Sequence, residues 1–141
     1  MNEKFLSRGK REDNGKWVEG YYVELPEDQH GNKLHIIIDS DGQYNRIIPE
    51  TAGRYTTLND RNEIPIFDGD IIELDHPYMG KSKHKVIWEW DEHMWNLSDF
   101  YATCFDYPSE AFSEGTQYMT VIGNVYDNPE LLTDKEKKRN A

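Results

Sequence analysis

Short apolar runs separated by clusters of Gly, Asp, Asn and Pro recur along the whole chain, and this alternation is its most constraining feature. It is typical of antiparallel strands joined by tight turns. Asp13-Asn14-Gly15 precedes the run Trp17–Val23, and Ser40-Asp41-Gly42 separates Leu34–Ile38 from Tyr44–Ile48. Asn-Gly and Asp-Gly pairs tolerate the positive φ values of hairpin turns. The pattern therefore predicts a mainly β fold built from hairpins.

Further strands are expected in the second half of the chain. We expect Ile64–Phe67 to be extended, Asp68-Gly69 to turn the chain into a strand at Asp70–Leu74, and Tyr118–Ile122 to form the last strand. The three consecutive isoleucines at 36–38 indicate burial on both faces of their strand. Four segments are expected to be loops or irregular backbone: Leu25–Lys33, Glu50–Thr57, Pro77–Lys83 and Ser98–Gly115. For Ser98–Gly115, a short helix is the alternative.

A tryptophan-rich hairpin is predicted around residue 90. Trp88 and Trp90 share one strand face, and Trp95 and Leu97 share a face of the following strand. Pairing Trp90 with Trp95 sets Trp88 opposite Leu97 and makes Asp91–Met94 the connection. This register puts the large apolar groups on one face, which a one-residue slip would undo. We expect these tryptophans to serve the core rather than an exposed aromatic binding platform.

The C-terminal string Asn128-Pro129-Glu130 is predicted to begin a helix. Asn is a favoured N-cap, Pro fits the first helical position, and an acidic residue in the first turn suits the helix dipole. Gly69 is expected to adopt a positive φ, and Gly123 to allow close packing where its strand ends. We expect residues 1–132 to form a single domain and the charged tail, residues 133–141, to be frayed.

Composition bounds the compartment and the partners of the chain. Cys104 is the only cysteine, no apolar run approaches the ~20 residues of a membrane span, and the N-terminus has no secretory signal. We therefore expect a cytoplasmic protein. The formal net charge is −11 and no basic stripe is present, so direct binding to nucleic acid or to a membrane surface is not expected.

The sequence holds no catalytic signature such as Gly-x-Ser-x-Gly, a phosphate-cradling glycine loop or His-Glu-x-x-His. Cys104 has no neighbouring base and is expected to be a small buried residue. A metal site would need His30 and His35 to converge with Asp39 and Asp41 across a hairpin, and the histidines lack metal-ligand spacing. We expect no catalytic residue, no cofactor and no metal site. The histidines are His30, His35, His76, His84 and His93.

Two alternatives to a simple binding role stay open. Asp68 and Asp70 could form a cryptic acid–base site with a histidine, although Asp-Gly is ordinary turn chemistry. The acidic middle of the chain could imitate DNA phosphates and inhibit a DNA-binding protein, although such a charge excess is most often a solvated surface.

Three groups of strings carry more information together than apart: Arg8-Gly9-Lys10 with Gly15–Gly20, then Pro49-Glu50-Thr51 with Tyr55–Leu58 and Ile66–Ile72, and then Ile122–Leu132. In this order and at these spacings, the chain resembles the YopX family from Phe5 to Leu132. The chain departs from the family pattern at Thr57, where the family usually has Gly. It departs again around Asn62-Glu63, where the family usually has an Asn-Gly turn.

The resemblance implies a β-rich fold with a small β-barrel and short peripheral helices, encoded by a phage or prophage. It carries over no catalytic residue, so we expect a non-enzymatic phage accessory protein that binds a host or phage protein. Such a protein could in addition form a homo-oligomer. The family-motif residues are expected to be structural, as turns, caps and packing positions. They are Trp17, Gly20, Tyr55, Asp68, Gly69, Asp70, Gly123, Asn124, Tyr126, Asn128 and Pro129.

Overall fold

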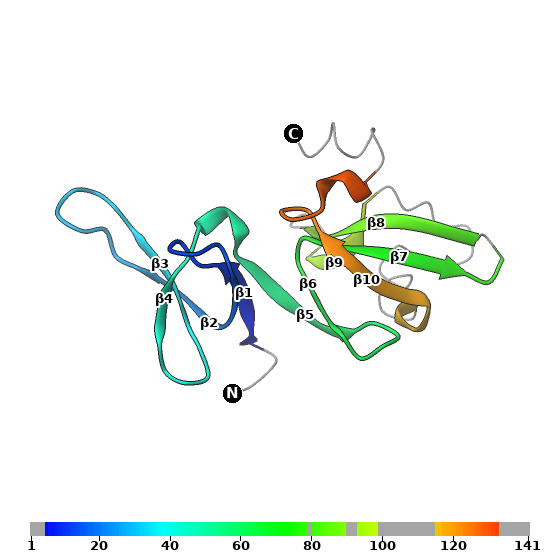
Figure 1. The fold of residues 1–141 in the computed structure, drawn as a ribbon, viewed down its shortest axis with the longest axis horizontal. Coiled ribbons are helices and arrows are strands. Elements are labelled where there is room, and N and C mark those ends of the chain that lie inside the picture. Colours follow the sequence, from blue (N-terminus) through cyan, green and yellow to red (C-terminus); the bar gives the residue numbers. More distant parts are fainter. Residues whose placement is uncertain (1–4, 79, 90–92, 99–114, 133–141) are drawn as a thin grey trace. The chain divides into compact units, whose positions relative to one another are not determined.

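The computed structural model describes residues 5–78, 80–89, 93–98 and 115–132, which belong to two compact units, Met1–Tyr55 and Thr56–Ala141 (Figure 1). The strands pair antiparallel in two sheets, which confirms a mainly β fold. The elements are β1 (Ser7–Lys10), β2 (Trp17–Leu25), β3 (Leu34–Ile38), β4 (Tyr44–Arg46), η2 (Pro49–Thr51), β5 (Gly53–Asn59), β6 (Pro65–Phe67), β7 (Asp70–His76), β8 (Gly80–Glu89), β9 (Met94–Leu97), η3 (Gly115–Tyr118), β10 (Met119–Asn124) and η4 (Pro129–Leu131).

Helical structure is limited to short 3-10 turns in the part of the chain that the structure describes. The peripheral α-helices that the family resemblance implies are therefore not found there. None of the described helices has the length and apolarity that crossing a membrane would require. The expected tail at residues 133–141 and most of the expected loop or helix at Ser98–Gly115 lie outside the described residues.

The first unit is an antiparallel sheet made by successive hairpins. β1 pairs with β2, β2 with β3 and β3 with β4, and the predicted turns contain Gly15 and Gly42 at positive φ (69° and 77°). Ile36 and Ile37 are both buried, which confirms burial on the two faces of β3. β4 lies at the edge of its sheet, whose order is β4-β3-β2-β1-β5-β6, and the division between the units falls inside β5.

Two glycines let the strands of the first unit approach one another closely. A Cβ on Gly20 would lie 2.1 Å from the carbonyl oxygen of Ile38, and one on Gly9 would lie 2.7 Å from the Cδ1 atom of Ile47. Beyond the ends of β1 and β4, an isolated antiparallel bridge joins Arg11 to Ile47. This bridge links the two ends of the four-strand hairpin series, but the predicted small barrel does not close among the residues described.

Two segments that were expected to be loops form strands. Glu50–Thr57 was expected to be irregular, but most of it belongs to β5, which pairs with β1 through Ser7 and Arg54. Pro77–Lys83 was expected to be a loop, but β8 begins at Gly80 and pairs with β7. Both strand segments are polar, so their apolar pattern is weak, and main-chain pairing with a neighbouring strand decides their conformation.

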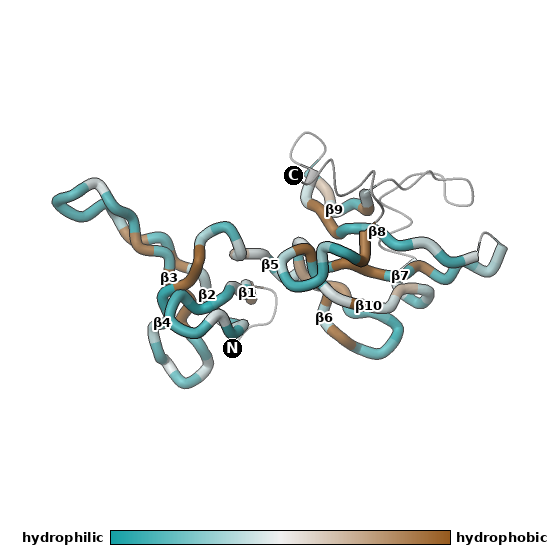
Figure 2. The backbone as a smooth tube through the Cα atoms, turned by 45° about the horizontal axis from the view of Figure 1, so that its top comes forward, coloured by the Kyte–Doolittle hydropathy of each residue, from teal (hydrophilic) through white to brown (hydrophobic). Residues whose placement is uncertain are grey.

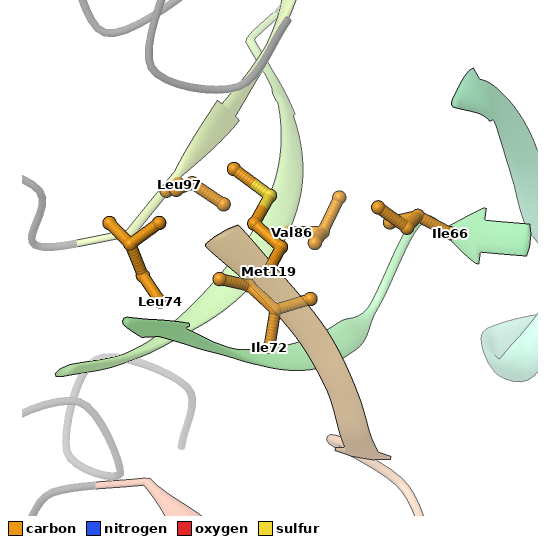
Figure 3. Close-up of a cluster of buried hydrophobic side chains, with 6 residues drawn as sticks. All are labelled: Ile66, Ile72, Leu74, Val86, Leu97 and Met119. Carbon is orange, nitrogen blue, oxygen red and sulfur yellow. The ribbon is translucent and has the colours of Figure 1, made fainter. Parts of the chain in front are cut away.

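The second unit contains the largest apolar cluster of the described residues. Its four-stranded sheet has the order β10-β7-β8-β9, and residues from β6 to β10 bury their side chains together (Figure 3). Figure 2 shows the matching pattern along the backbone, with hydrophilic hairpin loops and hydrophobic stretches within strands such as β7. The buried members of the cluster are Ile66, Ile72, Leu74, Val86, Leu97 and Met119.

The β8–β9 hairpin has a different register from the one predicted. Trp88 faces Trp95 and Val86 faces Leu97, so the partners are shifted by two positions. An even shift keeps the same side chains on the core face, which explains why the predicted face is right although the pairing is wrong. The two tryptophan rings meet edge to face at 5.2 Å between centroids. The connection spans 90–93 instead of 91–94, and Trp90 is not among the described residues.

Three hairpin loops share one hydrogen-bonding plan, in which an aspartate side chain closes the turn. In each loop one carboxylate oxygen accepts the main-chain N–H groups two and four residues further on, at 2.8–3.0 Å. The fourth residue of each loop has a positive φ, which the tight turn requires. The aspartates are Asp28, Asp39 and Asp60, and the fourth residues are Gly31 (80°), Gly42 (77°) and Glu63 (65°).

Asp60 differs from the other two aspartates because it also joins the loop to a distant strand. Its Oδ1 atom closes the turn, while its Oδ2 atom accepts the N–H of Val121 in β10 at 2.9 Å. The side chain is 4% exposed. The same connection is strengthened by a hydrogen bond from the Arg61 N–H to the carbonyl of Met119 at 3.0 Å. Asp60 thereby ties the β5–β6 turn to the last strand of the second unit.

Thr57 and Glu63 have left-handed backbone (φ 70° and 65°), and they are the two positions at which the family resemblance implies glycine. An L residue in this region costs about 1–2 kcal/mol, while glycine loses more backbone entropy. We predict that Thr57→Gly and Glu63→Gly each raise the free energy of unfolding by about 0.5–1 kcal/mol in urea titrations. Glu63→Ala is the control and should give no gain, because it keeps the Cβ. Equal stability of the Gly and Ala variants would contradict this account.

Asp60→Ala is expected to cost roughly 2–5 kcal/mol, because it removes a buried acceptor and leaves main-chain N–H groups without it. Asp28→Ala removes the same turn contacts from an exposed loop that makes no bond to another strand. It should cost clearly less. Urea unfolding of the two variants side by side measures the difference, and similar losses would mean that the Val121 contact contributes little.

Candidate functional site

Two open hollows in the first unit lie along β4 and share the residues Glu12 and Arg46. An ion pair of 3.4 Å between Arg46 Nε and Glu12 Oε2 stands where the hollows adjoin. The first hollow, about 420 Å³, lies between the β1–β2 turn and β4, and is lined by Arg11, Glu12, Asp13, Tyr44, Asn45 and Arg46. The second, about 460 Å³, is lined by Glu12, Asp28, Asn32, Lys33, Leu34, His35, Arg46, Ile47, Ile48 and Pro49.

The first hollow is polar and its charges are matched. The Arg11 guanidinium donates to both carboxylate oxygens of Asp13, at 3.1 and 2.8 Å, and Arg46 pairs with Glu12. Two cations and two anions therefore leave the lining without formal net charge. Tyr44 stands at this hollow with 73% of its surface exposed, far more than an aromatic side chain in a core.

The second hollow has apolar residues in its lining and charged residues around them. Leu34, Ile48 and Pro49 supply the apolar surface, and the side chain of Ile47 beneath them is buried. Lys33 pairs with Glu24 at 3.3 Å, and the Tyr22 hydroxyl is hydrogen-bonded to Nδ1 of His35, whose ring it stacks against. Burial is the main cause that raises the pKa of Tyr22. Apolar surface flanked by ion pairs suits a peptide better than a highly charged ligand.

Asn45 fixes β4 in place from within the sheet. It is buried, and its Nδ2 donates to the carbonyls of Ile37 and Gln43 and to Oδ2 of Asp39, at 3.0–3.1 Å. The bond from Asn45, followed by the main-chain N–H of Gln43, lowers the pKa of Asp39. The same kind of main-chain donation, from Asn32 and then His30, lowers the pKa of Asp28. The loops at both ends of β3 are thus closed by ionised aspartates.

β4 presents main-chain groups on the side away from β3. Gln43 and Ile47 bond to Asp39 and His35, so in the alternating antiparallel pattern the N–H and C=O groups of Tyr44 point the other way. Arg46 also faces outward, and its carbonyl accepts the Glu12 N–H at 2.9 Å. Among the residues described, no strand lies on the outer side of Tyr44, because β4 ends the sheet.

The family-motif residues of the first unit have packing roles. Trp17 is covered by two cations of β1, with the guanidinium carbon of Arg8 4.7 Å and the Lys10 ammonium 5.6 Å from its ring. Gly20 permits the close approach to β3 described above. The Tyr55 N–H donates to the carbonyl of Leu6 at 2.9 Å. These residues hold the sheet together, and none of them lines either hollow.

In the second unit, the Asp68-Gly69-Asp70 string meets the C-terminal string. Gly69 has a φ of 87°, as predicted; its carbonyl accepts the Val125 N–H at 2.9 Å, and the Tyr126 ring lies against it. The buried carboxylate of Asp70 accepts the Phe67 N–H at 2.8 Å, which closes the turn. This placement favours turn chemistry over the cryptic acid–base site.

The C-terminal string forms a tight polar turn, and the predicted N-cap is wrong. Oδ1 of Asn124 accepts the N–H groups of Tyr126 and Asp127 at 3.0 and 2.9 Å. Asn128 makes no side-chain cap bond to the 3-10 turn η4 that begins at Pro129; its Oδ1 atom instead accepts the Asn124 N–H at 3.3 Å. A Cβ on Gly123 would lie 2.6 Å from that oxygen, so glycine is required for close packing there.

The remaining sequence candidates do not assemble into a site. No cluster of three or more His, Cys, Asp or Glu residues suited to a metal is found among the described residues, which exclude Cys104. His84 is 5% exposed; its Nε2 contacts the Ser82 hydroxyl and its Nδ1 the Ser98 carbonyl, both at 2.7 Å. A carbonyl only accepts, so Nδ1 carries the proton and Ser82 donates. His84 is therefore a fully hydrogen-bonded core histidine.

Sequence reasoning did not single out Tyr44, Arg46 or Arg11 as site residues. The hollows arise because the β1–β2 turn and β4, more than 30 residues apart, are brought together by the Arg11–Ile47 bridge. Only one signal was available: a large aromatic residue directly after the polar Asp41-Gly42-Gln43 turn, flanked by polar neighbours on a short strand.

The fold defines a mainly β protein of two units with antiparallel strand pairing, and no cluster of residues suited to a metal is found among the residues described. The YopX protein family model matches residues 5–133, so the chain belongs to the YopX family. It is similar in fold to protein EF1440 from Enterococcus faecalis, whose crystal structure matches with a TM-score of 0.54 and 24% identity. That match covers 90% of this chain and 96% of the other. No match was found among curated proteins.

Gly69→Ala is predicted to cost more than about 1 kcal/mol of unfolding free energy, because it combines a forced positive φ with a 3.2 Å approach to Tyr126. Gly42→Ala is the matched control, since Gly42 has a similar φ but no atom within 4 Å of its Cβ position. Urea unfolding should rank Gly69→Ala as the more damaging change. Equal losses would show that the Tyr126 contact adds nothing.

Proposed function

We propose that this YopX-family protein is a phage or prophage accessory protein that acts in the cytoplasm of the bacterial host by binding another protein, without catalysing a reaction. The observation that carries the proposal is the pair of hollows beside β4, where an exposed aromatic side chain adjoins apolar and charge-matched surface. Aromatic anchors in hollows of this kind are typical of protein interfaces. A single cysteine suits a reducing compartment.

The acidic excess supports a protein partner more than imitation of DNA. At least eight of the 27 acidic residues already have bonding partners within the chain: some accept main-chain N–H groups in turns, and others pair with neighbouring cations. A DNA mimic would instead display its carboxylates in an outward row with phosphate-like spacing. The turn-closing acids are Asp28, Asp39, Asp60 and Asp70, and the paired acids are Glu12, Asp13, Glu24 and Glu73.

Photo-crosslinking in host lysate tests the proposal. A photoreactive phenylalanine analogue replaces Tyr44 in the full chain, and the matched control carries it at Tyr78, which is 87% exposed in the second unit. We expect a host or phage protein to be crosslinked reproducibly from position 44 and not from position 78.

Two other outcomes are informative. A protein crosslinked equally from both positions would keep the binding role but move its site away from β4. Absence of any specific product in lysates from cells expressing the phage genes would contradict a protein-binding function.

A further inference from the structure

We infer that the hollow between β4 and the β1–β2 turn receives an extended peptide segment of the partner, which pairs with β4 as an added strand. This inference rests on the proposed protein-binding function and names the site and the chemistry of the partner. The partner segment is uncharged where it faces the polar hollow and carries an apolar side chain for the second hollow.

The first argument is the orientation of the main chain. The N–H and C=O groups of Tyr44 point away from β3, and on that side the main-chain bonds from the end of β1 reach only Arg46 and Ile48. An extended segment supplies the donors and acceptors that complete such an edge, and addition of a strand is a recurrent mode of peptide recognition. A small ligand without a peptide-like backbone would match this edge less well.

The second argument is the shape of the surface next to β4. All three residues of β4 line the first hollow, and Arg11, Glu12 and Asp13 form its opposite side. The Glu12 N–H already bonds to the Arg46 carbonyl, so this main-chain bond limits the added strand to the stretch beside Tyr44. A segment that continues past the Glu12–Arg46 ion pair reaches Ile48 in the second hollow.

The third argument is charge. Arg11 and Arg46 are each paired with a carboxylate at the hollow, so neither offers the excess positive charge that a nucleic-acid strand or a strongly acidic peptide would need. Binding such a ligand would require breaking both ion pairs. A segment with polar, uncharged side chains leaves them intact, and the exposed Tyr44 ring gives it a rigid surface to pack against.

The test uses the full-length protein as bait for a displayed library of random 12-residue linear peptides, with Tyr44→Pro as the counter-target. Proline removes the outward N–H at this position without touching the bonds to β3, and edge strands tolerate it. Tyr44→Ala removes the ring and keeps the N–H. We expect selected peptides to lose about tenfold or more in affinity for Tyr44→Pro, and less for Tyr44→Ala. Tyr78→Ala should bind as the wild type does.

A second measurement uses the unmodified protein, so it does not depend on the folding of a variant. Selected peptides are resynthesised with single N-methyl groups along their length. Because the open edge is limited to Tyr44, pairing with β4 predicts that methylation weakens binding sharply at the one peptide N–H that faces the Tyr44 carbonyl and much less at its two neighbours, which point away from the edge. NMR amide shifts at Tyr44 and Arg46 should move on binding.

Several results would overturn the inference. They are peptides that bind Tyr44→Pro as tightly as the wild type, an N-methyl series in which no position is more sensitive than its neighbours, or failure to select any peptide that distinguishes the counter-target. Self-association that Tyr44→Pro abolishes would assign the edge to a second copy of the chain and would also overturn it. The lysate crosslinking decides the proposed function separately, since the peptide experiments report only on the β4 hollow.

Discussion

The buried carboxylate of Asp60 is the contact on which the second unit most depends. One oxygen closes the turn between β5 and β6, and the other holds β10 through the N–H of Val121, 61 residues further along the chain. A carboxylate with several acceptor positions can satisfy main-chain donors from two places at once. The apolar cluster shown in Figure 3 includes Ile66 of β6, which follows this turn, and Met119 of β10, so the polar contact and the apolar core join the same segments.

Local chemistry in the sequence predicted the turns well and the pairing less well. Gly15, Gly42 and Gly69 have the positive φ expected, because that conformation is a property of a few neighbouring residues. The partners in the β8–β9 hairpin and the existence of β5 depend on main-chain pairing with another strand. The absence of the Asn128 cap depends on the length of the helix, which ends after one turn. Such choices are settled by tertiary contacts, which a single sequence does not display.

The family motifs and the candidate binding surface occupy different residues. Trp17, Gly20, Gly69 and Gly123 act through packing and close approach. Of the residues that line the hollows, only Pro49 belongs to the family strings. This division explains why the resemblance predicted the fold class and its turns but gave no binding residue. A shared scaffold can carry partner-specific surfaces, so membership of a family and choice of partner are separate questions.

The shortness of β4 also bears on solubility. An exposed strand edge is a template for uncontrolled stacking of copies, and proteins limit that hazard with short edges and charged side chains. β4 has three residues, ends in Arg46, and is bounded by the Asp39–Gln43 turn on one side and the Glu12 bond on the other. Such an edge has room for one brief pairing and no continuous ladder on which further chains could grow. The feature that makes the strand available therefore also keeps it from seeding aggregates.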